Sequence, residues 1–153
     1  MKNVTTMQSM FCNCLSLTTL DVSGFDTKNV TSMQNMFYNC SSLTTLDVSG
    51  FDTKNVTSIY YMFVSGGNLT NLIFGPNWGT QTSTAAVALT LDLSSVGSTK
   101  SRKLTDETWA SMLTMYDRAT AGLTNMTIKL NKNHNVPDGW AAKMAERGYT
   151  ISY

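Results

Sequence analysis

Apolar and polar residues alternate with a period of two along short stretches of the chain. In residues 43–48, Leu46 and Val48 face one side, while Thr45 and Asp47 face the other. The Ser-Gly that follows supplies a sharp turn, because glycine adopts positive φ without a steric penalty. This pattern predicts a short strand with one buried and one exposed face.

The segment that returns from each strand has a different spacing. Residues 29–37 carry apolar side chains at positions i, i+3, i+6 and i+7, which is the spacing of a helix face. Thr31 and Gln34 stand at the spacing of a capping box, and Thr5 and Gln8 repeat it. We therefore expect each unit to consist of a strand, a turn, a short helix and a return.

This unit recurs at a fixed period. Residues 3–28 and 29–54 align without a gap at a period of 26 (29 − 3 = 26), and they differ only at positions 6/32, 9/35, 12/38 and 15/41. A third, degraded copy occupies residues 55–80. Such a period predicts a solenoid in which each unit buries its apolar face against its neighbours.

The remaining residues, 81–153, lose the repeat but keep alternating strand and helix patterns. Strands are predicted at residues 87–93, 126–130 and 149–153. A helix should run from 104 to about 118, with Thr105 as its N-cap. A second helix should open at Pro137 and close at Gly148. We interpret these residues as irregular C-terminal coils and a cap within one domain, 1–153.

Six strands result from this reading, the first three at residues 17–22, 43–48 and 69–74. Right-handed crossovers would make all six neighbours in one parallel sheet. The prediction is therefore an α/β right-handed solenoid, with short helices on the side opposite the sheet. The outward residues of this sheet would be Thr19, Asp21, Thr45, Asp47, Asn71, Ile73, Thr90, Asp92, Thr127 and Lys129.

Two interpretations of this outward face stay open. Threonine is common on solvated sheet faces because its branched side chain favours strands. Alternatively, the same row could form a flat polar surface that binds a protein or a glycan. The strand at 17–22 would leave one edge unpaired, and this predicts self-association through the N-terminal coil.

The composition argues against a disordered protein, a nucleic-acid-binding protein and a membrane-inserted protein. The chain of 153 residues is 42% hydrophobic and 14% charged, with a net charge of +1. It is too apolar to be disordered and too weakly charged to present a basic nucleic-acid-binding patch. It contains no run of about 18 apolar residues, so no membrane insertion is expected. The N-terminal residues also lack the apolar stretch of a signal peptide.

Residues with reactive side chains are few. Cys14 and Cys40 occupy the same repeat position, where stacking would place them about 4.8 Å apart. We interpret them as small buried apolar residues, because parallel neighbouring side chains suit a disulfide poorly. Cys12 and His134 lack the partners of a metal motif. No catalytic residue, metal site or cofactor is predicted.

Aspartates also recur with the repeat. Asp21 and Asp26 in the first copy correspond to Asp47 and Asp52 in the second. Columns of carboxylates could hold calcium. Aspartate that caps a tight turn explains the same pattern with fewer assumptions, and we favour this interpretation.

The repeat resembles that of the BspA-like bacterial surface proteins, which have leucine-rich repeats. The shared motifs are Asn-Val-Thr-x-Met, Met-Phe-x-x-Cys-x-x-Leu and Leu-Asp-Val-Ser-x-Phe-Asp, and residues 3–63 carry them. The resemblance implies a non-enzymatic binding or adhesion module at a bacterial cell surface, or in a phage structural protein. It also implies the C-terminal part of a longer array, secreted or surface-exposed. The alternative is a purely structural capping stack without a ligand.

Overall fold

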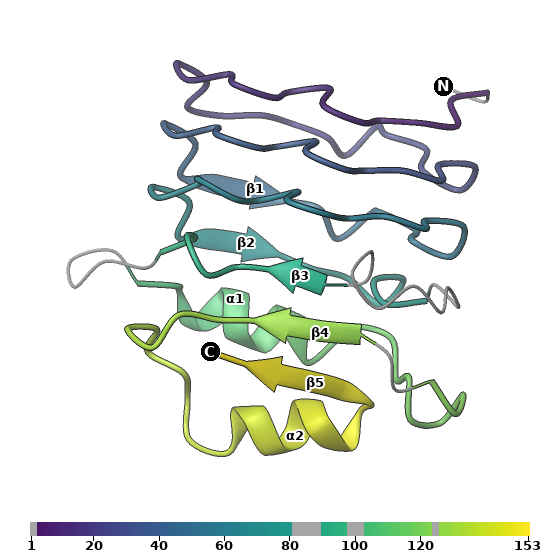
Figure 1. Cartoon of the computed structure of the whole chain (residues 1–153), viewed down its shortest axis with the longest axis vertical. Helices are drawn as coiled ribbons and strands as arrows, with labels where there is room; N and C mark the ends of the chain where they lie inside the picture. Colours follow the sequence, from purple (N-terminus) through teal and green to yellow (C-terminus); the bar gives the residue numbers. More distant parts are fainter. Residues whose placement is uncertain (1–2, 81–89, 98–102, 124–125) are drawn as a thin grey trace.

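The computed structural model describes residues 3–80, 90–97, 103–123 and 126–153. Successive turns of the chain lie above one another, with the N-terminus at the top of Figure 1 and α2 at the bottom. The elements are β1 (Thr45–Asp47), β2 (Asn71–Ile73), β3 (Thr90–Asp92), α1 (Asp106–Met112), β4 (Met126–Lys129), α2 (Trp140–Glu146) and β5 (Tyr149–Ser152). Every strand pair is parallel, so the α/β class is confirmed.

The first three coils, residues 3–28, 29–54 and 55–80, each contain two legs. The front legs (3–13, 29–39 and 55–65) are drawn nearer the viewer in Figure 1, and the back legs (17–22, 43–48 and 69–74) lie behind them. Isolated parallel bridges join the front legs at Thr6, Ser32 and Ser58. The front legs of all three coils are therefore joined by bridges, and the back legs of the second and third coils pair through β1 and β2.

The predicted helix in residues 29–37 is wrong. Backbone N–H groups of this leg donate to the next coil, as in Met33 N to Ser58 O at 2.9 Å and Phe37 N to Met62 O at 3.0 Å. Asn35 has a φ of 56°, in the left-handed region that interrupts a right-handed helix. The leg is a chain of tight turns in which donors bonded to the next coil alternate with donors bonded three residues back, as in Met36 N to Met33 O at 3.2 Å.

The predicted capping box at Thr31 and Gln34 is wrong for the same reason. The Thr31 hydroxyl donates to the carbonyl of Thr5 at 3.0 Å, and Thr57 repeats this bond to Thr31. The backbone N–H of Gln34 is bonded to the Ser32 hydroxyl at 3.4 Å. Thr31 and Thr57 thus join coils and cap no helix.

The predicted core positions of the repeat are confirmed. Phe11, Phe37 and Phe63 form a stacked column with centroid separations of 5.6 and 5.8 Å. A second column joins Phe25, Phe51 and Trp78 at 6.4 and 6.3 Å. The aliphatic and methionine positions of the second coil are buried as well: Val30, Met33, Met36, Leu43, Leu46 and Val48.

The prediction of one continuous six-stranded sheet is wrong. Residues 17–22 form no strand, β1 pairs only with β2, and β3, β4 and β5 form a separate sheet. On the side of β2 away from β1 lies α1. Two buried hydroxyls of α1 accept backbone N–H groups there, Thr108 from Leu72 at 2.9 Å and Ser111 from Phe74 at 3.1 Å. Helix side chains therefore occupy the place predicted for the next strand.

The second sheet lies on the other side of the molecule. In Figure 1, β3, β4 and β5 are nearer the viewer and point in the direction opposite to β1 and β2. The neighbour of this segment is the third front leg, since the backbone N–H of Ser65 donates to the Ser95 hydroxyl at 2.8 Å. The parallel strands therefore lie on the back of the molecule up to β2 and on the front from β3 onward.

Both C-terminal helices form, with boundaries that differ from the prediction. Thr105 is the N-cap of α1, and its hydroxyl accepts from the backbone N–H of Thr108 at 3.2 Å, as predicted. The second helix, α2, begins at Trp140 behind Gly139 rather than at Pro137. Gly148 follows with a φ of 86°, and an added Cβ would lie 2.6 Å from the carbonyl oxygen of Leu123. Glycine is therefore required at the turn into β5.

Candidate binding faces

The ten residues predicted to form one binding face fall into two groups. Thr19, Asp21, Thr45 and Asp47 are all exposed and lie on the back legs of the first two coils. Asn71 and Ile73 continue this row in register with Thr45 and Asp47, but they are half-buried. We call the first four residues the back-face row.

The back face ends where α1 packs beside β2. The Asn71 side chain donates to Glu107 at 2.9 Å and accepts from the Thr105 hydroxyl at 2.9 Å. Its polar atoms are therefore used to attach the helix. Asn71, predicted to lie on the binding face, thus also contributes to the packing of α1 against β2.

The aspartates of the back-face row also hold turns. Asp47 accepts the backbone N–H of Ser49 at 2.8 Å, and Asp21 accepts that of Ser23 at 2.9 Å. Hydrogen bonds from the side chain and backbone of Ser23 lower the pKa of Asp21. The turn-capping interpretation was made for the Phe-Asp-Thr-Lys bends and is confirmed there, since Asp26 accepts the backbone N–H of Lys28 at 3.3 Å and Asp52 that of Lys54 at 2.9 Å. Asp21 and Asp47 cap turns as well, and they remain exposed at the surface.

The other four predicted residues lie on the front sheet. Thr90 is in register with Thr127, and Asp92 with Lys129. Lys129 and Asp92 form an ion pair at 3.1 Å. Burial alone would raise the pKa of Asp92, but hydrogen bonds from Ser94 and Lys129 outweigh it, so the pKa is lowered. These residues form a surface separate from the back-face row.

His134 is buried although it lies in a polar loop. Its Nδ1 accepts the backbone N–H of Asn131 at 3.2 Å, and Nε2 lies 2.6 Å from the carbonyl oxygen of Val96. Burial lowers its pKa, and the bond to Val96 opposes this shift. The imidazole therefore joins two loops. Among the described residues, no group of three or more His, Cys, Asp or Glu side chains could hold a metal ion.

The three cysteines are free thiols near the first two coils. Cys40 is buried, and its sulfur donates to the carbonyl of Phe11 at 3.1 Å. Burial raises the pKa of the Cys40 thiol to about 11. Cys12 and Cys14 are half-buried. Cys40 is thus a small core residue, as predicted, and its thiol is protonated at neutral pH.

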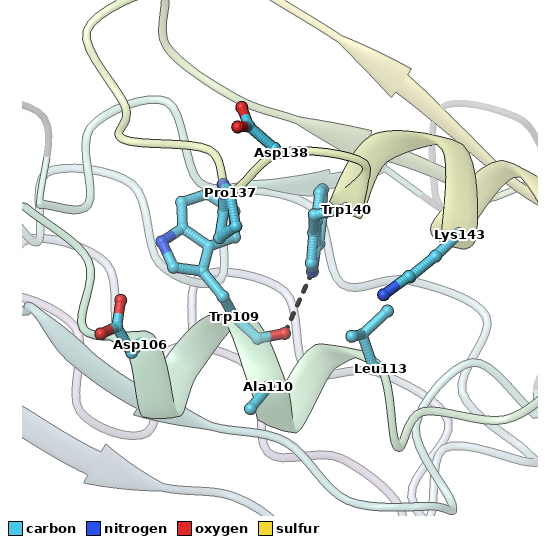
Figure 2. Close-up of a pocket in the computed structure, with 8 residues that line it drawn as sticks. All are labelled: Asp106, Trp109, Ala110, Leu113, Pro137, Asp138, Trp140 and Lys143. Carbon is cyan, nitrogen blue, oxygen red and sulfur yellow. Dashed lines mark hydrogen bonds between the residues drawn. The ribbon is translucent and has the colours of Figure 1, made fainter.

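A pocket of about 280 Å³ lies between α1 and the segment that leads into α2. Figure 2 shows the Trp140 ring with its nitrogen toward the Trp109 carbonyl, to which it donates at 3.0 Å. The two rings meet edge to face at 4.9 Å, and each residue is only 2% exposed. Since these rings are covered, we assign them to the packing of α1 against α2. No spacing or motif in the sequence indicates this pair, because the two tryptophans lie 31 residues apart.

No helix in the described part of the chain is both long and apolar enough to cross a membrane.

Comparison with known proteins gives one family. The model described as "Mycoplasma protein of unknown function, DUF285" matches residues 1–100, which include the three coils and β3. Neither the curated proteins nor the solved structures gave a match.

Proposed function

This chain belongs to the DUF285 family, and from that premise we propose that it is a non-enzymatic module that binds a protein or a glycan. The observation that carries the proposal is the back-face row. Thr19 and Thr45, with Asp21 and Asp47, present hydroxyl and carboxylate groups at the same positions of adjacent coils, and all four are exposed. Hydroxyls and carboxylates recognise the amide and hydroxyl groups of both ligand classes.

The finer architecture is also proposed, as a right-handed solenoid of leucine-rich-repeat type related to the BspA-like proteins. Support comes from side-chain hydrogen bonds that join adjacent coils. Asn39 donates through its side chain to Asn13 at 2.9 Å, and the Thr53 hydroxyl donates to Asn77 O at 3.0 Å. Asn68 likewise donates to Ser41 O at 2.6 Å.

These bonds favour binding because they fix the relative positions of the adjacent coils that carry the row. A surface that is already ordered loses little conformational entropy when a partner docks on it. The stacked phenylalanine columns inside the coils also hold adjacent coils in fixed positions. In our proposal the module works at a cell surface or in a secreted protein, as one part of a longer chain.

The binding proposal is tested on the back-face row itself. We would measure the chain against a glycan array and a panel of immobilised extracellular-matrix proteins. Thr45→Arg introduces a bulky cation at an exposed position, and Asp47→Asn removes the charge while keeping an acceptor for Ser49. Both should abolish any specific signal. Thr120→Arg, at an exposed threonine outside the row, is the matched control.

Unchanged binding in both row variants would refute this face as the binding site. The alternative function is a structural stack that supports neighbouring coils and binds nothing. It predicts no signal on either panel, and it predicts that deletion of this region from a longer parent lowers solubility without lowering adhesion. Turnover of simple esters or glycosides that a single point mutation abolishes would overturn the non-enzymatic proposal.

A further inference from the structure

We propose that Tyr60 and Tyr61, on the front leg of the third coil, form an aromatic platform that binds one sugar ring of a glycan, with Asp92 and Lys129 of the front sheet as its polar partners. We call this pair of tyrosines the tyrosine platform. The front legs lie on the side of the molecule opposite the back legs in Figure 1, so the platform is separate from the back-face row and does not depend on the ligand proposed there.

The two tyrosines depart from the repeat at positions where the first two coils carry polar residues. Tyr60 stands where those coils have glutamine, and Tyr61 stands where they have Ser9 and Asn35. The backbone bonds are the same with either side chain, since Ser9 N donates to Gln34 O at 2.9 Å and Asn35 N donates to Tyr60 O at 2.9 Å. The fold therefore does not require an aromatic residue at either position.

Tyr61 also has a backbone conformation that disfavours a large side chain. Its φ is 56°, in the left-handed region, where asparagine and glycine are far more frequent than bulky residues. Ser9 and Asn35 have nearly the same φ, at 57° and 56°. The Tyr61 side chain is 39% exposed, so little burial compensates for the strain. Strained residues of this kind cluster at sites that bind ligands.

The two rings form one aromatic surface. Their centroids are 3.7 Å apart, and the angle between the ring planes is 27°. Tyr60 is half-buried and Tyr61 is exposed. The hydroxyl of Tyr60 is hydrogen-bonded to that of Tyr61, and this bond, ahead of burial, raises the pKa of Tyr60. Tyr60 is therefore neutral at physiological pH, and a neutral phenol is both a donor and an acceptor.

Charged groups of the front sheet stand beside this surface. The carboxylate of Asp92 is near enough to Tyr60 to contribute to the raised pKa of that tyrosine. Asp92 pairs with Lys129 at 3.1 Å, and Lys129 is exposed. These groups match the two sides of a sugar: its C–H face packs on an aromatic ring, while its hydroxyls donate to a carboxylate and accept from an ammonium group.

A proline-rich peptide matches the platform less well. Such peptides bind in grooves between aromatic side chains, and rings stacked at 3.7 Å leave no groove between them. A single platform makes few contacts, so we expect a dissociation constant of about 1 mM for a short oligosaccharide. Binding this weak is lost when an array is washed, so the platform does not contribute to the array signal predicted for the back-face row.

The test is an NMR titration of the full chain with cellotriose, maltotriose and triacetylchitotriose, with transfer of saturation to the sugar as the readout. At least one of the three should bind the wild type. The double variant Tyr60→Gln/Tyr61→Asn restores the residues of the second coil, and it should bind at least tenfold more weakly. Its urea midpoint should be equal to or above that of the wild type, because the strain at residue 61 is relieved. Tyr116→Asn, at a 38% exposed tyrosine outside the platform, is the matched control and should bind like the wild type.

Three results would overturn the proposal. The first is no binding of any of the three sugars to the wild type, and the second is unchanged binding in the double variant. The third is binding of a proline-rich peptide but of no sugar, lost in the double variant, which would assign the platform to a protein partner. Thr45→Arg, which tests the back-face row, should leave binding of the trisaccharides unchanged, so the two proposals succeed or fail separately.

Discussion

The phenylalanine column makes the stacking energy of the coils measurable at a single repeat position. Phe37 is 1% exposed and lies between Phe11 at 5.6 Å and Phe63 at 5.8 Å. Replacement of a buried phenylalanine by alanine costs about 3–5 kcal/mol through lost transfer energy and the cavity left behind. We expect Phe37→Ala to lower the free energy of unfolding by about this amount.

Phe11 occupies the same position one coil earlier and provides the matched comparison. It is half-buried, so a large part of its surface is already in contact with water. We expect Phe11→Ala to cost about half as much, roughly 1.5–2.5 kcal/mol. The difference between the two losses in free energy of unfolding measures the effect of a covering coil, because the residue type and the repeat position are the same.

Equilibrium urea unfolding measures both values. With an m-value of about 2 kcal/mol/M, the midpoint should fall by about 1.5–2.5 M for Phe37→Ala and by about half of that for Phe11→Ala. An equal or larger loss for Phe11→Ala would refute the reasoning that, among the described residues, the second coil is covered on both sides and the first on one side only.

Three further predictions address single contacts. Thr108→Val keeps the shape of a fully buried side chain but leaves Leu72 N–H without its acceptor, so calorimetry should show a loss of about 1–3 kcal/mol. The lowered pKa of His134 means that the unfolded state binds the proton first, so urea midpoints should fall as pH drops below about 6.5, and His134→Gln should lack this step. Cys40, buried and with a thiol pKa of about 11, should react with Ellman's reagent only on unfolding, after the other two thiols; early reaction of all three would contradict its burial.

The sequence was sufficient for features that depend on one repeat unit and its identical neighbour. A period of 26 residues places equal side chains above one another, so the buried methionine, leucine and phenylalanine positions were predictable. The turn role of Asp52 and the N-cap role of Thr105 were predictable too, because each depends on a bond to a residue two or three positions away.

The spacing of apolar residues gave a wrong prediction where a backbone N–H group can bond either within its own turn or to a neighbouring coil. Residues 29–37 have the apolar spacing of a helix, yet an N–H group there can bond to the next coil as well as to its own turn. The left-handed conformation at Asn35 and Asn39 directs these donors outward. The choice depends on a neighbouring coil with matching acceptors, and that information lies outside any single helical window.

The candidate binding face likewise depends partly on local sequence and partly on tertiary structure. Thr-Leu-Asp with a serine two residues later occurs at 45–49 and again at 90–94, and both segments make the same aspartate turn. Identical local chemistry predicted a shared face. The two segments lie on different sides because the hydroxyls of Thr108 and Ser111 in α1 accept the backbone N–H groups at the edge of β2. The next strand, β3, therefore does not pair with β2 and pairs with β4 instead. The sequence by itself determined each exposed residue of the row, and only tertiary hydrogen bonding decided which of those residues share a surface.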